Sequence, residues 1–136
     1  MKKSCFLFLV LFGFAISGFA QSVTNNSTCD INVSYGYNYV DPVLGCTSTG
    51  ALGGTTLTPV SAGGTAWTFP PPPPGQWIIL HFVFPGTGCS VFDPFVSDPG
   101  NCFGLPLDDV IQGNSCTTCP PTANVTNVGG LDWDIN

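Results

Sequence analysis

Cysteines are the residues of this chain whose spacing most directly suggests chemistry. Cys116 and Cys119 stand two residues apart, which is the spacing of sites that exchange thiols and disulfides. In such sites a helix that begins at the pair lowers the pKa of a thiol. Here the pair is followed by two prolines, and no helical pattern comes after them. The sequence therefore favours a structural disulfide role for these cysteines over a redox site.

Side chains that could act as general acids, bases or nucleophiles are scarce. His81 is the single histidine, and it lies inside an apolar run with no nucleophile tied to it by a motif. Asp108 and Asp109 are adjacent, so in a strand their side chains would point to opposite faces. The sequence holds no nucleophile elbow, zinc-protease motif or phosphate-binding glycine loop with a lysine. We therefore predict a protein that is not an enzyme and that carries no cofactor.

Oxygen-bearing side chains alternate along the C-terminal residues. Asp132, Asp134 and Asn136 would share one face of a strand, and hard cations such as calcium favour clustered carboxylates. The central glycine and the distant glutamate of a calcium loop are missing. The alternative is a solvent-facing strand whose charges discourage pairing with another chain. The sequence favours this alternative and leaves the three residues as calcium-ligand candidates.

The first twenty residues have the parts of a secretory signal. Two lysines open the chain, an apolar run covers residues 5–16, and small residues lead to Ala20. The apolar run is shorter than the roughly 20 residues that a membrane span needs. We predict a cleaved signal peptide over residues 1–20 and a product without a membrane span, either secreted or associated with the cell envelope.

The charge of the chain excludes several classes of partner. Its two basic side chains are Lys2 and Lys3, so none remains beyond the predicted signal, and all eight acidic residues are aspartates. Binding to phosphates needs cationic side chains, so nucleic acid is excluded as a partner and an anionic membrane surface is disfavoured. The absence of glutamate and the scarcity of lysine and arginine also argue against surface helices.

Six cysteines lie beyond the predicted signal, and an even number in an exported chain predicts disulfides. They are Cys29, Cys46, Cys89, Cys102, Cys116 and Cys119. The sequence does not select one pairing among the many that six cysteines allow. Short separations make local guesses natural, and these are Cys29 with Cys46, Cys89 with Cys102, and Cys116 with Cys119.

Alternation of apolar and polar residues predicts several strands. It is clear over residues 29–38 and again over the terminal residues 131–136. Residues 55–60 and 65–69 have the composition of two short strands around a glycine-rich turn. Together with short apolar patches between later turns, these segments give about six to eight strands, the pattern of a β-sandwich.

Two segments are predicted to lie outside the strands. Residues 21–28 are polar and are predicted to form a loose N-terminal segment. The five prolines of residues 70–74 favour an extended polyproline conformation and cannot form a central strand. We interpret them as a stiff connector, with a ligand for a proline-binding module as the alternative.

Residues 76–85 are apolar on both faces of a predicted strand. Such a strand is either central in the fold or covers its outer face with a partner. The predicted interaction strand consists of Trp77, Ile79, His81, Phe82 and Phe84. Aromatic residues elsewhere could stack on sugars, but in a domain of this size most of them must fill the core.

The chain resembles small exported bacterial β-sandwich proteins. The resemblance is carried by Phe19-Ala20-Gln21, the strand from Cys29 to Val33, the Gly- and Thr-rich middle and the tail from Leu131 to Asn136. It implies the fold and the compartment and transfers no activity or site residue.

These observations combine into one prediction. We expect a single domain over residues 29–136, an all-β, immunoglobulin-like antiparallel sandwich with disulfides. Its expected function is that of a non-catalytic structural or adhesive module that acts through surface contacts, including self-association. The alternative is an extracellular module that binds carbohydrate or calcium.

Overall fold

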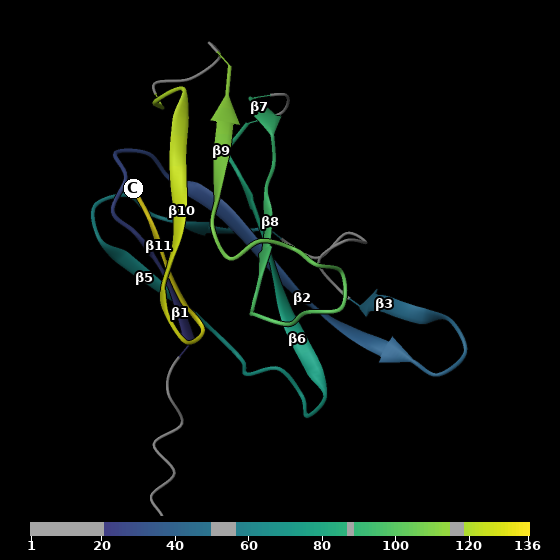
Figure 1. The fold of residues 1–136 in the computed structure, drawn as a ribbon. Helices are drawn as coiled ribbons and strands as arrows, with labels where there is room; N and C mark the ends of the chain where they lie inside the picture. The colour runs from purple at the N-terminus through teal and green to yellow at the C-terminus, as the bar shows by residue number, and fades with distance from the viewer. Residues whose placement is uncertain (1–20, 50–56, 87–88, 115–118) are drawn as a thin grey trace, which may run out of the picture.

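The computed structural model describes residues 21–49, 57–86, 89–114 and 119–136. Within these ranges the chain forms eleven strands and no helix (Figure 1). The strands belong to two sheets whose buried side chains meet in one hydrophobic cluster. The predicted all-β, sandwich-like fold is confirmed, although the strands outnumber the six to eight that were expected.

The first sheet has six strands. Their spatial order is β5 (Thr65–Phe69), β1 (Gln21–Asn25), β11 (Asp132–Ile135), β10 (Thr122–Gly129), β9 (Asp109–Gly113) and β7 (Ser90–Phe92). Neighbouring strands are antiparallel except β1 and β11, which are parallel. The predicted terminal strand is therefore the third strand of this sheet.

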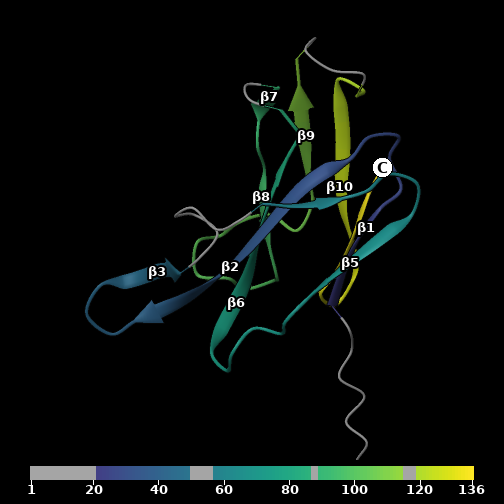
Figure 2. The same cartoon turned by 180° about the vertical axis from the view of Figure 1, so that it is seen from behind.

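The second sheet has five strands. Four lie in the order β3 (Gly45–Thr49), β2 (Ile31–Asp41), β6 (Gln76–Val83) and β8 (Phe95–Ser97), and β4 (Thr58–Val60) also pairs with β2. All of these pairs are antiparallel. β2 is long enough for β4 to pair with its start and β3 with its end, so β2 and β3 extend beyond the rest of the sheet (Figure 2).

The prediction that residues 21–28 form a loose segment is wrong. Residues 21–25 form β1, which lies between β5 and β11 and buries Val23 completely. The buried Asn25 side chain donates to the carbonyl oxygens of Cys29 and Val60, both at 2.8 Å. Tertiary hydrogen bonds of this kind leave no periodic apolar pattern in the sequence.

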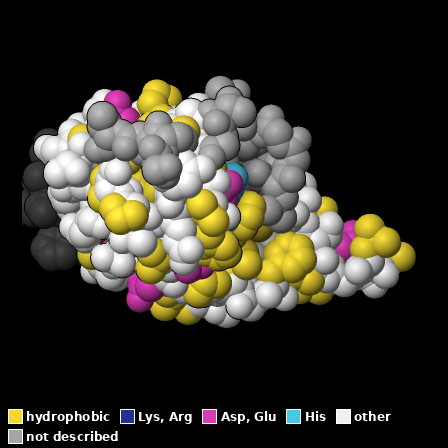
Figure 3. Space-filling model, turned by 90° about the horizontal axis from the view of Figure 1, so that it is seen from above, with side chains coloured by type: hydrophobic (Ala, Val, Ile, Leu, Met, Phe, Trp, Pro, Cys, Tyr) yellow, Lys and Arg dark blue, Asp and Glu magenta, His cyan; other side chains and the backbone are white. Residues whose placement is uncertain are grey.

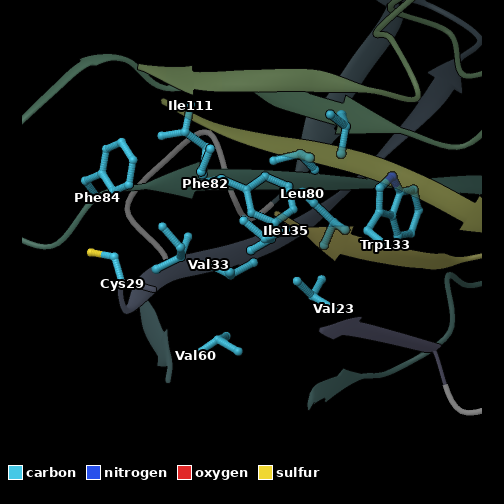
Figure 4. Packing of buried hydrophobic residues seen from close by; sticks show 14 of the residues in the cluster. Val23, Cys29, Val33, Val60, Leu80, Phe82, Phe84, Ile111, Trp133 and Ile135 are labelled. Carbon is cyan, nitrogen blue, oxygen red and sulfur yellow. The ribbon is translucent and has the colours of Figure 1, made fainter. Parts of the chain in front are cut away.

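The hydrophobic core lies between the two sheets (Figure 4). β6 directs Leu80 and Phe82 into it, and β11 directs Trp133 and Ile135 into it from the opposite sheet. All four side chains are completely buried. The indole nitrogen of Trp133 donates to the carbonyl oxygen of Leu107 at 2.9 Å, so its one polar atom is satisfied inside the core.

No helix in the described ranges is long and apolar enough to cross a membrane. The predicted signal peptide lies outside the described residues.

Candidate functional site

Two disulfides join distant parts of the chain. Cys29 is bonded to Cys119 across 90 residues, and Cys46 is bonded to Cys102 across 56 residues. The three local pairings expected from the sequence are therefore wrong. Short separation lowers the entropy cost of closing a loop, but the fold places other cysteines side by side and this decides the pairing.

The predicted redox spacing is not used as an internal disulfide. Cys119 is bonded to Cys29, and Cys116 lies outside the described residues. Cys89 is also disulfide-bonded. The described cysteines therefore hold the fold together, as the sequence favoured, and disulfides of this kind are compatible with an extracellular location.

The most prominent surface feature is the projecting β2–β3 hairpin. It extends beyond the body of the molecule, and hydrophobic side chains gather at its tip (Figure 3). Val43 is 87 % exposed and Leu44 is 78 % exposed, while Val40 is 60 % exposed. We call these three residues the hairpin tip. They are among the most exposed large hydrophobic side chains of the described residues.

The backbone of the hairpin tip is held by one aspartate. The Asp41 carboxylate accepts hydrogen bonds from the backbone N–H groups of Leu44 at 2.7 Å and Val43 at 2.8 Å. These two bonds lower the pKa of Asp41 below its usual value. Gly45 completes the turn with a φ of 79°, which favours glycine. Apolar side chains thus stand on a turn of defined conformation.

The hairpin is also tied to a second turn. Cys46 is the second residue of β3, and its disulfide to Cys102 attaches the hairpin to the segment between β8 and β9. Phe103 follows Cys102 and is 43 % exposed. The disulfide therefore links the hairpin, at a residue opposite Val40 of the tip, to a segment that carries a further exposed apolar side chain.

Sequence analysis missed the hairpin tip. Asp41-Pro42 and Gly45 come shortly after the alternating residues 29–38 from which a strand was predicted. The same residues are the signal that could have revealed the hairpin, because Asp-Pro followed by glycine between two strand-forming runs is typical of a tight β-connection.

A separate pocket lies near the start of β2 and the end of β6. Its volume is about 430 Å³, and its lining includes Asn32, Leu57, Val83, Ser90 and Asp93. One carboxylate oxygen of Asp93 is buried and has no hydrogen-bond partner among the residues that the structure describes. An acceptor without a donor is costly in a protein interior, so this oxygen favours any ligand that brings a hydroxyl or N–H group.

His81 lies close enough to Asp93 of this pocket for the two side chains to interact electrostatically. Its ring stacks on Phe95 with the centroids 4.3 Å apart. Burial lowers the pKa of His81, and the charge of Asp93 acts in the opposite direction. An imidazole that is half-buried and packed against an aromatic ring fits the structural role that the sequence favoured.

The predicted interaction strand is mostly buried. Ile79 and Phe82 are completely buried, and Phe84 is 2 % exposed. Trp77 and His81 are half-buried. Because three of the five side chains are already packed within the molecule, they are not available as an open contact surface.

Two of the three calcium-ligand candidates, Asp132 and Asp134, lie in β11, and Asn136 comes directly after this strand. Asp132 and Asp134 alternate with the buried Trp133 and Ile135. Asp132 accepts hydrogen bonds from the backbone N–H of Ser22 at 2.8 Å and from its hydroxyl at 2.9 Å. No group of three or more His, Cys, Asp or Glu side chains able to hold a metal occurs in the described ranges. Calcium binding therefore stays a prediction.

Several aromatic residues meet at one margin of the core. Tyr35 contacts Tyr37, Trp67 and Phe69, with ring centroids 5.8, 5.9 and 6.4 Å apart respectively. The rings are tilted or edge-on to one another in the first two contacts, which is the geometry of core packing rather than of a flat platform.

Comparison of the chain with family models, curated proteins and solved structures finds no match.

Proposed function

We propose that this chain is an exported, non-catalytic structural or adhesive module, and that the hairpin tip makes the contact. The observation that carries the proposal is the exposure of Val43 and Leu44, at 87 % and 78 % of their surface. The immunoglobulin-like sandwich that the sequence predicts serves in this proposal as the scaffold that presents the tip.

Exposed aliphatic side chains cost little singly, but their grouping on a projection favours a contact role. Burial of a valine or leucine side chain against a partner contributes about 1.5 to 3 kcal/mol. The Asp41 hydrogen bonds and the Cys46–Cys102 disulfide hold the tip in one conformation before it binds. Less conformational entropy is then lost on contact, so more of the burial energy remains as affinity.

The test compares beads coated with wild-type protein and with a Val43→Ser/Leu44→Ser variant. Retention on purified cell-envelope fragments of the encoding organism is measured by microscopy. We expect the wild-type beads to be retained and the variant beads to lose most of this retention, because the variant removes the apolar surface without touching the core.

Val128→Ser is the matched control, because Val128 is 58 % exposed on β10. It should behave as wild type. Absence of retention of wild-type beads would contradict an adhesive function, and equal retention of wild type and the tip variant would place the contact elsewhere.

A second candidate function is carbohydrate binding at the pocket beside Asp93. The observation in its favour is the buried Asp93 oxygen without a donor, since sugar hydroxyls are donors. A glycan array with wild type and an Asp93→Ala variant tests this, and we expect signals that disappear in the variant. Repeating the array with a chelator separates carbohydrate binding from calcium-dependent binding.

A further inference from the structure

A turn between β8 and β9 holds one peptide carbonyl in an unusual way. Asp98-Pro99-Gly100-Asn101 follows β8, and Gly100 has a φ of 79°. Proline in the second position and a positive φ in the third are typical of a type II turn. The backbone N–H of Asn101 donates to the carbonyl oxygen of Asp98 at 3.3 Å.

The same carbonyl oxygen accepts a second hydrogen bond. The side-chain Nδ2 of Asn101 donates to it at 3.0 Å. Leu105 fixes the Asn101 amide, because its carbonyl oxygen accepts from Nδ2 and its backbone N–H donates to Oδ1, both at 2.9 Å. Two donors therefore point at the oxygen of the Asp98–Pro99 peptide bond, and their position is set before any reaction.

Donors arranged in this way stabilise negative charge that develops on a carbonyl oxygen. The reaction that develops such charge here is attack by the Asp98 carboxyl on its own peptide carbonyl. The ring that forms has five members, and the leaving nitrogen belongs to Pro99, which has no amide hydrogen. Pro99 and Gly100 are exposed, so water reaches the bond.

The surroundings of the Asp98 carboxyl favour its protonated form. Burial raises the pKa of Asp98, and hydrogen bonds from the backbone N–H groups of Asp98 and Ile78 and from the Ser97 hydroxyl act in the opposite direction. In the part of the chain that the structure describes, no charged side chain contributes to this shift. The carboxyl thus keeps the proton that the leaving nitrogen needs at a higher pH than an ordinary aspartate.

We propose that the Asp98–Pro99 peptide bond is a self-cleavage site that hydrolyses in mildly acidic solution. The Asp98 carboxyl oxygen bonds to the peptide carbonyl carbon, and the carbon–nitrogen bond to Pro99 breaks as the carboxyl proton passes to the nitrogen. The product is a cyclic anhydride on Asp98 and a free amine on Pro99. Water then opens the anhydride to two carboxyls.

Cleavage would leave the molecule in one piece. Cys29 and Cys46 precede the bond, while their partners Cys119 and Cys102 follow it. Both disulfides therefore span the cut. The reaction converts one chain into two that stay covalently joined until the disulfides are reduced.

The chain contains two other Asp–Pro bonds, Asp41–Pro42 and Asp93–Pro94, and the first serves as the internal control. In that turn the Asp41 carboxylate accepts two hydrogen bonds from backbone N–H groups, and these bonds lower the pKa of Asp41. At a given pH a smaller fraction of this carboxyl is protonated than in an ordinary aspartate, so less of it carries the proton for the leaving nitrogen. The same dipeptide should therefore be slow in the hairpin and fast in the Asn101 turn.

The test incubates the folded full chain between about pH 3 and pH 7 and follows the fragments by mass spectrometry after reduction. We expect fragments that end at Asp98 and begin at Pro99, formed at least about tenfold faster than those from Asp41–Pro42. On non-reducing gels the protein should migrate as one species. In the reduced, urea-unfolded chain the two bonds should be cleaved at similar rates.

Two variants separate the chemistry from the stability of the turn. Asn101→Ala removes a donor and should slow cleavage at Asp98–Pro99 by about tenfold or more, without changing the rate at Asp41–Pro42. Asp98→Glu keeps a carboxyl but requires a larger ring, and it should lose the reaction while near-ultraviolet circular dichroism at the test pH shows an intact fold.

Three results would each overturn the proposal. They are intact wild-type protein over the whole pH range, equal cleavage of Asp98–Pro99 and Asp41–Pro42 in the folded chain, and an unchanged ratio of these two rates in a folded Asn101→Ala variant.

Discussion

Two turns of this molecule begin with an Asp–Pro dipeptide, and the aspartate accepts the hydrogen bonds of the turn through different atoms in the two places. In the hairpin turn the side chain of Asp41 accepts two backbone N–H bonds, and its pKa is lowered. In the turn after β8 the main-chain oxygen of Asp98 accepts the bonds, while burial raises the pKa of its side chain. The Cys46–Cys102 disulfide joins the two turns.

The difference comes from the position of the glycine and from what covers the aspartate. Gly100 lies two residues after Asp98, whereas Gly45 lies four residues after Asp41, and both have a φ of 79°. With glycine two residues after the aspartate, the turn closes by a hydrogen bond to the aspartate's main-chain oxygen. With glycine four residues after it, the aspartate's carboxylate accepts the backbone N–H groups of the loop instead. One dipeptide can therefore stabilise a turn in one place and be reactive in another.

The largest effect on the free energy of unfolding is expected from removing the disulfide that joins the two turns. A Cys46→Ala/Cys102→Ala variant removes a link across 56 residues. It should lower the free energy of unfolding by about 2 to 4 kcal/mol, because the unfolded chain regains the entropy of an open loop. Denaturant unfolding under non-reducing conditions measures this. An unchanged unfolding midpoint would show that the turns are held together by other contacts.

A smaller loss is expected from Asn101→Ala. The side chain makes hydrogen bonds to Asp98 and to both polar groups of the Leu105 backbone. Removal leaves partly buried partners unsatisfied and should cost about 1 to 3 kcal/mol. Denaturant unfolding at neutral pH, where cleavage is not expected, gives the value. A loss close to zero would mean that water replaces the amide.

The pH dependence of stability should have opposite signs in the two turns. The raised pKa of Asp98 means that its stabilising contribution is present below the unfolded pKa and lost as the pH rises through the folded pKa. Relative to wild type, Asp98→Asn should therefore gain unfolding free energy between about pH 4 and pH 7.

For Asp41 the lowered pKa means that the contribution is present above the unfolded pKa and lost as the pH falls through the folded pKa. Asp41→Asn should then be less stable than wild type at neutral pH, and the difference should shrink in acid. Thermal unfolding over a pH series tests both variants, and parallel curves for the two would contradict the comparison.

The smallest effect on stability is expected at the hairpin tip. Val43→Ser and Leu44→Ser should change the free energy of unfolding by no more than about 0.5 kcal/mol, because both side chains are already in solvent. A larger loss would mean that the tip packs within its own molecule. It would also weaken the proposal that the tip is kept for a partner.

Strands with a regular pattern were predictable from the sequence, and irregular ones were not. β2, β5, β6 and β11 were expected from alternation or from apolar runs, and all four are present. β1 was missed because its buried Asn25 is satisfied by hydrogen bonds to Cys29 and Val60. A polar residue that is buried in this way looks exposed in a one-dimensional pattern.

The candidate sites were less predictable than the fold. The disulfide role of the cysteines was correctly expected for the described part of the chain, and the structural role of His81 stays a prediction, but the hairpin tip and the Asn101 turn were not anticipated. Both depend on which atoms of an aspartate receive hydrogen bonds, and this follows from backbone angles that glycine permits.

The sequence by itself determined that the fold is all-β and that the cysteines form disulfides. Composition and the two-residue alternation of strands are local properties, so they can be read from the sequence without knowing which residues are in contact in the fold. Only the tertiary structure decided which cysteines pair, which apolar residues remain in solvent, and whether the side chain of Asp41 or the main-chain oxygen of Asp98 accepts the hydrogen bonds of its turn. Each of these depends on contacts between residues that are distant in the chain, and local patterns carry no information about them.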